Sequence, residues 1–180
     1  MSLSTEGSVT VTTTYLEIPD RSLFRPATLS SPDLLLLQSY EPLPEFYRFL
    51  YGTVGRNYSW TDRLDWDNQR LRAHLALSAI TLLVLYVRGT PAGYVELNTE
   101  SDEPGTEVAY FGLFPFFQGR GLGKHLLSLG VERAYHDGAE RVWVHTCTLD
   151  GPHALANYQA RGFEAYRTTT HQQPITPAQQ

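Results

Sequence analysis

The sequence predicts one domain of the mixed α/β class. Its 180 residues match the usual length of a single domain, and strand-like and helix-like apolar patterns follow one another in the order β-α-α-β-β-β-α-β-α-β. Hydrophobic residues make up 42% of the chain and charged residues 18%, which excludes a disordered chain, a collagen repeat and a coiled coil. A domain of this length buries about 70% of the surface that its unfolded chain exposes, so a proper core can form.

The N-terminal segment, residues 1–32, has the weakest pattern. Apolar and polar residues alternate between Val9 and Tyr15 as they do in a strand, and three prolines interrupt the stretch that follows. We therefore expect an N-terminal extension that could add an edge strand to the sheet.

The next elements are a short strand and two helices. Four consecutive leucines within residues 33–39 predict a buried strand. Apolar residues recur at helical spacing in residues 43–51 and again in residues 66–77, which predicts two helices joined by the loop Gly52 to Asp67.

Three strand-like runs then follow, separated by turn signals: residues 79–88, 92–98 and 106–114. A broad leucine stripe predicts a long helix over residues 121–137, which Gly138 ends. The remaining expected elements are a buried strand, a short helix, a last strand and a loose tail, over residues 141–147, 153–161, 163–170 and 171–180.

The composition argues against several classes of partner and of metal site. Lys and Arg number 14 against 19 Asp and Glu, and this net charge of -5 argues against nucleic acid. The single cysteine, Cys147, excludes a disulfide framework and a cysteine-rich zinc site, and the histidines show no metal-ligand spacing, so no metal is expected. No apolar run reaches the ~18 residues of a membrane span, and no signal peptide is evident, so we expect a cytoplasmic protein without a membrane partner.

The strongest chemical signal lies between the third of the three strand-like runs and the long helix. The run is Gln118-Gly119-Arg120-Gly121-Leu122-Gly123-Lys124. Alternating glycines let backbone N–H groups converge on one point, and the helix N-terminus adds unpaired donors and a positive dipole end. Arg120 and Lys124 add two cations. The run therefore predicts a pyrophosphate site, although it fits neither the Walker loop nor the dinucleotide fingerprint.

Two motifs resemble the GNAT (GCN5-related) N-acetyltransferases. Gln118 to Gly123 is similar to the family pattern Gln/Arg-x-x-Gly-x-Gly/Ala, and Tyr158 to Phe163 is similar to the pattern Tyr-x-x-x-Gly-Phe. The resemblance covers residues 33–170. It implies a three-layer fold in which helices flank a central mixed, mostly antiparallel sheet, and it implies acetyl-CoA as the co-substrate.

In this family the glycine loop holds the pyrophosphate of acetyl-CoA, and the preceding strand splays from its neighbour to bind the pantetheine arm. The resemblance thus implies that the backbone N–H of Leu113 polarises the acetyl carbonyl. Many members carry a cofactor-contacting asparagine where this chain has Gly151; Asn157 would point in a different direction. The expected co-substrate contacts are Phe111, Leu113, Phe114, Pro115, Gln118, Gly119, Arg120, Gly121, Leu122, Gly123, Lys124 and Asn157.

The reaction that the resemblance implies is direct transfer of an acyl group to an amine, which must lose a proton before it attacks. Glu107 is the expected base, six residues before Leu113 and on the strand face of Phe111. Glu96 is the alternative, and either carboxylate could instead be a solvated or ion-paired group. Tyr158 is expected to protonate the leaving thiolate, or else to pack its helix on the sheet.

The acceptor site is expected in the loop between the first two helices. Tyr58, Trp60 and Asp62 suit a small amphipathic amine or an amino acid derivative, and Asp62, Glu96 and Glu107 favour a cationic one. Trp60 could equally anchor the loop on the core. His145 shares a strand face with Cys147; a site role for the histidine stays open, and the cysteine is expected to be a buried apolar residue.

Three functions remain in competition. An acetyl-CoA-dependent N-acetyltransferase acting on a small-molecule primary amine is the first. The others are a non-catalytic acyl-CoA-binding module and an O-acyl or longer-chain acyltransferase. Four phenylalanines near the acyl end, Phe111, Phe114, Phe116 and Phe117, favour a short acyl group. A homodimer is left open.

Overall fold

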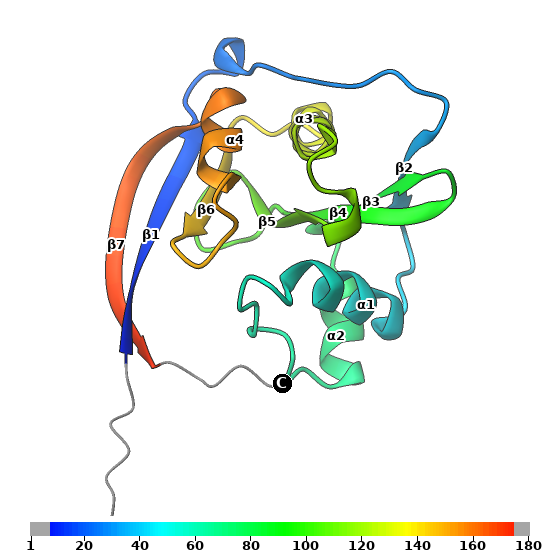
Figure 1. The fold of residues 1–180 in the computed structure, drawn as a ribbon, viewed down its shortest axis with the longest axis horizontal. Helices are drawn as coiled ribbons and strands as arrows, with labels where there is room; N and C mark the ends of the chain where they lie inside the picture. The colour runs from blue at the N-terminus through cyan, green and yellow to red at the C-terminus, as the bar shows by residue number, and fades with distance from the viewer. Residues whose placement is uncertain (1–7, 175–180) are drawn as a thin grey trace, which may run out of the picture.

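A seven-stranded sheet runs through residues 8–174, which are the residues that the computed structural model describes (Figure 1). The strands are β1 (Ser8–Ile18), β2 (Leu34–Ser39), β3 (Ile80–Val87), β4 (Thr90–Asn98), β5 (Thr106–Leu113), β6 (Val142–Cys147) and β7 (Glu164–Pro174). The helices are α1 (Pro44–Gly55), α2 (Asn68–Leu75), α3 (Leu122–His136) and α4 (Ala154–Ala160). The strand order is β2-β3-β4-β5-β6-β1-β7.

The helices form layers on both sides of the sheet, α1 and α2 on one face and α3 and α4 on the other (Figure 1). Every strand pair is antiparallel except β5 with β6, which is parallel. The stripe of α3 packs into the core, where Leu126, Leu127 and Val131 are each 0% exposed. The expected mixed α/β fold, with a mostly antiparallel sheet between helices, is confirmed.

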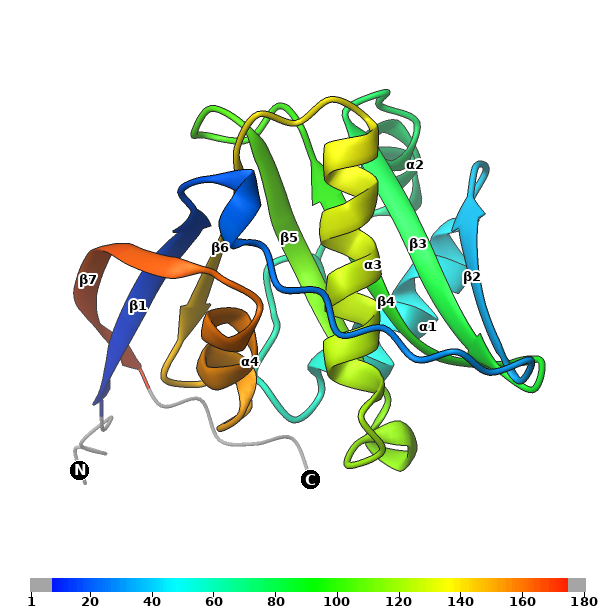
Figure 2. The same cartoon turned by 90° about the horizontal axis from the view of Figure 1, so that it is seen from above.

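The N-terminal strand corrects one expectation. β1 is not an edge strand, because it lies between β6 and β7 and pairs with both (Figure 2). Leu16 is 0% exposed and Ile18 is 2% exposed within the core. An alternating pattern identifies a strand but not its neighbours, so the sequence could not distinguish an internal position from an edge.

The expectation of a loose C-terminal tail over residues 171–180 is also wrong in part. β7 continues to Pro174, since residues 171–174 pair with residues 8–11, from His171↔Val11 to Pro174↔Ser8. The tail had no visible partner in the sequence because that partner lies at the other end of the chain. The rest of the expected tail, residues 175–180, falls outside the described residues, as do residues 1–7.

After the 3-10 turn Arg21–Leu23, the chain crosses the outside of α3 on its way from β1 to β2 (Figure 2). The backbone N–H of Ala27 donates to Oγ of Ser128 at 2.8 Å, and the N–H of Leu29 donates to Nδ1 of His125 at 3.0 Å. Two α3 side chains thus satisfy backbone donors of a segment that has no regular structure of its own.

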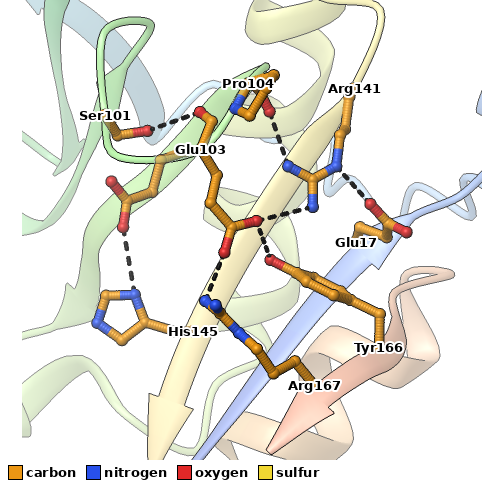
Figure 3. Close-up of polar contacts among 9 residues, drawn as sticks. Glu17, Ser101, Glu103, Pro104, Arg141, His145, Tyr166 and Arg167 are labelled. Atoms are coloured by element: carbon orange, nitrogen blue, oxygen red, sulfur yellow. Dashed lines mark hydrogen bonds and ion pairs between the residues drawn. The ribbon is translucent and has the colours of Figure 1, made fainter.

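A polar cluster fastens β1, β6 and β7 to the turn before β5 (Figure 3). Glu103 in that turn accepts hydrogen bonds from the hydroxyl of Tyr166 at 2.6 Å and from Arg141 at 3.2 Å, and it also pairs with Arg167. Arg141 in turn pairs with Glu17 of β1. Within the described residues, no helix has the length and apolar character needed to cross a membrane.

Replacement of Leu16 tests whether β1 belongs to the core. Leu16→Ala removes a fully buried side chain, so the free energy of unfolding should fall by about 2–5 kcal/mol, measured by urea unfolding. Leu35→Ala on β2 is the matched control. That leucine is 54% exposed, and its loss should change the free energy by no more than about 0.5 kcal/mol. Equal effects would show that β1 does not belong to the core.

Candidate active site

The central feature of the site is the parting of β5 from β6. These strands pair only at Thr106↔Val142 and Glu107↔Trp143, although β5 continues to Leu113. Paired strands lie about 4.8 Å apart and leave no room for a ligand between them. Because the pairing of β5 with β6 stops after these two positions, the sheet is open beyond them. A cavity of about 990 Å³ fills the opening and is lined by both strands. The splayed strand that the family resemblance implied is therefore confirmed.

A bulge at Ala109 determines which side chains reach each face of the sheet. The β4–β5 register shifts there, from Leu97↔Val108 to Glu96↔Tyr110, and the extra residue reverses the alternation. Glu107 therefore lies on the face that α1 and α2 cover, together with Tyr110. Phe111 lies on the opposite face. The expectation that Glu107 and Phe111 share a face is wrong, and the cavity that both residues line passes through the sheet.

The face toward α3 carries the glycine turn. Gly119 and Gly121 both have φ +74°, in the left-handed region that favours glycine, and Gly121 is the N-cap of α3. The first N–H groups of a helix have no partner inside it and form an anion-binding end. A Cβ on Gly121 would lie 3.4 Å from Cε of Lys124, so the amine of this side chain lies beside the turn.

Most of the expected co-substrate residues line the cavity: Phe111, Leu113, Gln118, Gly119, Gly121, Gly123, Lys124 and Asn157. The departure at Gly151 has a steric reason, because a Cβ there would lie 3.2 Å from the ring of Tyr58. The hydroxyl of Tyr58 also accepts a hydrogen bond from Nε2 of Gln118 at 2.9 Å. Tyr58 thus connects the acceptor loop to the glycine turn.

Four expected co-substrate residues lie outside the cavity lining: Phe114, Pro115, Arg120 and Leu122. Phe114 packs edge-on against Phe49, and its N–H donates to the carbonyl of Ala92 at 2.8 Å. The guanidinium of Arg120 lies 4.5 Å from the ring centre of Phe116, and the side chain of Leu122 belongs to the core. The glycine turn therefore presents one cation to the cavity, that of Lys124.

The phenylalanines do not crowd the acyl end as expected. Phe111 lines the cavity, whereas Phe114, Phe116 and Phe117 do not, and Phe116 is 73% exposed. The 3-10 turn Pro115–Phe117 carries the latter two away from the opening. The sequence argument for a short acyl group therefore rests on Phe111 alone.

Tyr158 reaches the cavity from α4 and is 6% exposed. Its ring contacts Phe111 and Phe163 edge-on, with centroid distances of 6.1 and 5.8 Å. Burial, with a smaller contribution from the charge of Asp150, raises the pKa of its hydroxyl above the ordinary value. The hydroxyl is therefore protonated at neutral pH, as a proton donor must be, and the ring also packs α4 on the sheet.

Glu107 and His145 meet on the face toward α1 and α2. Nδ1 of His145 lies 3.2 Å from Oε1 of Glu107. The Glu107 side chain is 11% exposed, whereas the His145 side chain is 45% exposed and lines the cavity with it. The hydrogen bond with Glu107 raises the pKa of His145 despite partial burial, and the charges of Asp150 and Asp62 act in the same direction.

Glu96, the alternative base and expected acceptor contact, is absent from the cavity lining and is 0% exposed. Its carboxylate accepts from the hydroxyl of Tyr47 at 2.6 Å and from Arg63 at 2.7 Å, and it meets Nε2 of His74 at 3.0 Å. Burial opposes its ionisation, but His74, Arg63 and Tyr47 together lower its pKa. Glu96 is therefore a paired charge that joins β4 to α1 and α2, and both expectations for it are wrong.

The other expected acceptor residues do line the cavity: Tyr58, Trp60 and Asp62. Trp60 also packs on Tyr51 and Tyr110, at centroid distances of 5.5 and 5.0 Å, so it anchors the loop as well as lining the cavity. Asp62 accepts a hydrogen bond from the hydroxyl of Tyr110 at 3.1 Å. The bulge is what brings Tyr110 to this face.

Sequence reasoning missed one wall of the cavity. Val11 and Thr13 of β1, His171 and Gln173 of β7, and Asp150 after β6 all belong to the lining. The strand residues carry no local signal, because their position depends on the pairing of β1 with β7. Asp150 did carry a local signal in the sequence, since an aspartate just after a strand caps a turn. Its carboxylate accepts hydrogen bonds from Oγ1 of Thr146 and from the N–H of Cys147. Between Ser8 and Pro174, no cluster of three His, Cys, Asp or Glu residues could hold a metal ion.

Solved structures share this fold. A GCN5-related N-acetyltransferase from Kribbella flavida matches with a TM-score of 0.65 and 17% identity, over 94% of this chain and 61% of that chain. One from Sphaerobacter thermophilus matches with a TM-score of 0.64 and 15% identity, over 95% and 54%. An aminoglycoside acetyltransferase from an uncultured soil metagenomic sample, in complex with sisomicin, matches with a TM-score of 0.55 and 19% identity, over 72% and 86%.

The chain thus spans only 61% and 54% of the length of the two GCN5-related proteins, and these likenesses concern the fold. The sequence itself matches the model of the acetyltransferase (GNAT) family over residues 40–163. That match covers more than half of the chain and includes the bulged strand, the glycine turn and Tyr158. The protein described here belongs to the GNAT acetyltransferase family.

Proposed function

We propose that the protein is an acetyl-CoA-dependent N-acetyltransferase that transfers the acetyl group directly to a primary amine of a small molecule or amino acid derivative. One observation carries the proposal: a single cavity passes through the sheet where β5 parts from β6. It joins the glycine turn and the N-terminus of α3 on one face to Glu107 and His145 on the other. A thioester and an amine entering from opposite faces can meet in the opening.

The face toward α3 suits the phosphate end of the co-substrate. The N-terminal N–H groups of α3, the open backbone at Gly119 and the amine of Lys124 would bind the pyrophosphate. The backbone of β5 from Phe111 to Leu113 is freed from β6 and can bind the pantetheine arm. In this arrangement the N–H of Leu113 would polarise the acetyl carbonyl, which is where negative charge develops.

Proton transfer completes the assignment. Acetyl-CoA supplies an acyl carbon that an unprotonated amine can attack, and its thiolate leaves. The pair of Glu107 and His145 takes up a proton from the amine on the acceptor face. On the other face, Tyr158 lines the same cavity with its hydroxyl protonated, and it is our candidate for the donor to the thiolate.

The acceptor side favours a cationic, partly apolar amine. Asp62, Glu107 and Asp150 contribute carboxylates to the lining, and Trp60 and Tyr110 contribute aromatic surface. The cation of Arg63, which also lines the cavity, is paired with Glu96, so carboxylates dominate the field there. The structural likeness to an aminoglycoside acetyltransferase adds support for an amine acceptor.

Thiol release tests the proposal. The wild-type chain should release coenzyme A from acetyl-CoA when a panel of small primary amines is supplied, with cationic amphipathic amines giving the highest kcat/KM. Propionyl-CoA and longer thioesters in the same assay determine the acyl length. Tight acetyl-CoA binding without release for any amine would instead identify a non-catalytic binding module. Transfer to alcohols alone would identify an O-acyltransferase.

The glycine turn yields the first prediction for the site. Gly121→Val places a β-branched side chain at φ +74° beside Lys124, so the backbone can no longer approach a phosphate closely. Acetyl-CoA affinity, measured by titration calorimetry, should fall at least tenfold, or ~1.4 kcal/mol. Gly89→Val is the matched control, because Gly89 has φ +83° in the β3–β4 hairpin with nothing within 4 Å. Equal binding by both variants would contradict the phosphate site.

Tyr158 yields the second prediction for the site. Tyr158→Phe retains the ring and its packing, so stability should change by no more than about 1 kcal/mol. Turnover should fall by roughly 10–10³-fold if the hydroxyl protonates the thiolate. Tyr135→Phe is the control, because this buried tyrosine of α3 is not in the cavity lining. Full turnover in the Tyr158 variant, with an unchanged melting temperature, would reduce Tyr158 to a packing residue.

A further inference from the structure

We propose that the group that deprotonates the acceptor amine is Nε2 of His145, and that Glu107 is the positioning residue that holds the imidazole. This deepens the proposed function and rests on it. It replaces the simpler assignment in which the carboxylate of Glu107 itself takes the proton.

The geometry of the pair carries the inference. Glu107 contacts the Nδ1 edge of the ring at 3.2 Å, and a carboxylate there favours the tautomer with the hydrogen on Nδ1. The lone pair then lies on Nε2, which points away from Glu107 because the two nitrogens occupy different edges of the ring. His145 is the more exposed of the two side chains (45% against 11%) and lines the cavity. An amine in the cavity can therefore reach Nε2 more readily than the buried carboxylate.

The ring also has aromatic neighbours. Tyr15 of β1 lies 5.6 Å from the imidazole, with an interplanar angle of 34°, and Trp143 lies 6.2 Å away. The guanidinium of Arg167 lies 3.8 Å from the ring centre of Tyr15. Figure 3 shows His145 near the polar cluster that fastens this part of the sheet. A ring held by a carboxylate and by packed aromatic side chains is pre-organised for proton transfer.

Imidazole suits this role better than a carboxylate does. An ordinary carboxyl group titrates near pH ~4 and an ordinary imidazole near ~6.5, and a base works best when its pKa lies near the working pH. The charged groups around His145 are Glu107 on β5, Asp150 after β6 and Asp62 in the α1–α2 loop. All three carboxylates stabilise the imidazolium ion, and the Glu107 contact raises the pKa of His145 above its ordinary value.

The proton balance follows. The ammonium form of the acceptor gives one proton to Nε2 of His145, which becomes an imidazolium ion beside the carboxylate of Glu107. The freed nitrogen lone pair forms the N–C bond to the acyl carbon, and the C–S bond breaks. The thiolate takes a proton from the hydroxyl of Tyr158, and the second nitrogen proton, which leaves as the amide forms, restores that hydroxyl. His145, being partly exposed, returns its proton to solvent.

Only the neutral imidazole of His145 can accept a proton, so the neutral form is the active one. Rates should fall as the pH drops through the raised pKa of His145, so the acid limb of kcat/KM should have its midpoint above ~6.5. Loss of the Glu107 charge removes the main cause of the raised pKa. Glu107→Gln should therefore move the acid limb to lower pH. The acceptor amine titrates in the same way in assays of both proteins, so its own pKa does not affect the difference between the two pH profiles.

The test compares pH profiles of kcat/KM for the full chain with one amine. His145→Gln should lower kcat by 10²–10⁴-fold, abolish the acid limb and leave acetyl-CoA affinity unchanged. At alkaline pH, Glu107→Gln should lose less activity than His145→Gln does. The midpoint of its acid limb should lie at lower pH than that of the wild-type protein. His136→Gln, at the exposed C-terminal end of α3, is the control for replacing a histidine. Melting temperatures establish that each variant is folded.

The opposite pattern would overturn the proposal. If His145→Gln stays within about threefold of wild type while Glu107→Gln loses 10²-fold or more, Glu107 is the base and the acetyltransferase assignment stands. A wild-type chain that releases no thiol with any amine overturns both proposals. If His145→Gln does not fold, the Glu107→Gln profile decides, because an acid limb at the wild-type position excludes a positioning role for Glu107.

Discussion

The parting of β5 from β6 is the constraint on which the rest of the structure depends. Two paired positions hold the strands together at one end, and the unpaired remainder exposes backbone N–H and C=O groups that would otherwise be used in the sheet. Such groups are normally satisfied by a partner. Here they line a cavity, so the main chain itself becomes a binding surface. The glycine turn and α3 follow directly from the end of the freed strand.

The bulge at Ala109 and the buried charge of Glu96 give this opening two distinct sides. The bulge turns Glu107 and Tyr110 toward α1 and α2. Glu96, held by Tyr47, Arg63 and His74, fixes the helices and the loop that cover that side. Removing one partner of such a buried ion pair commonly destabilises a protein by about 3–5 kcal/mol. A residue that resembled a catalytic base in the sequence therefore supports the acceptor wall instead.

Local chemistry was readable from the sequence, and distant pairing was not. The glycine turn, the stripe of α3 and the tyrosine of α4 depend on residues close together in the chain. The structure brings the glycine turn and the tyrosine to one cavity and packs the stripe into the core. The internal place of β1, the extension of β7 and the cavity wall at Val11 and Thr13 depend on partners at the far end of the chain. The face of Glu107 was misassigned because one bulged residue reverses an alternating pattern.

The place of β1 between β6 and β7 has a consequence for how the chain folds. Ser8 pairs with Pro174, so the first described strand cannot be enclosed until the last one has been synthesised. Contacts between residues so far apart in sequence form slowly, because the entropy of closing the loop is lost before the contacts stabilise it. During synthesis the apolar side of β1, including Leu16 and Ile18, stays without its partners. We therefore expect docking of β1 to be a late step, after β2 to β5 have assembled around α3.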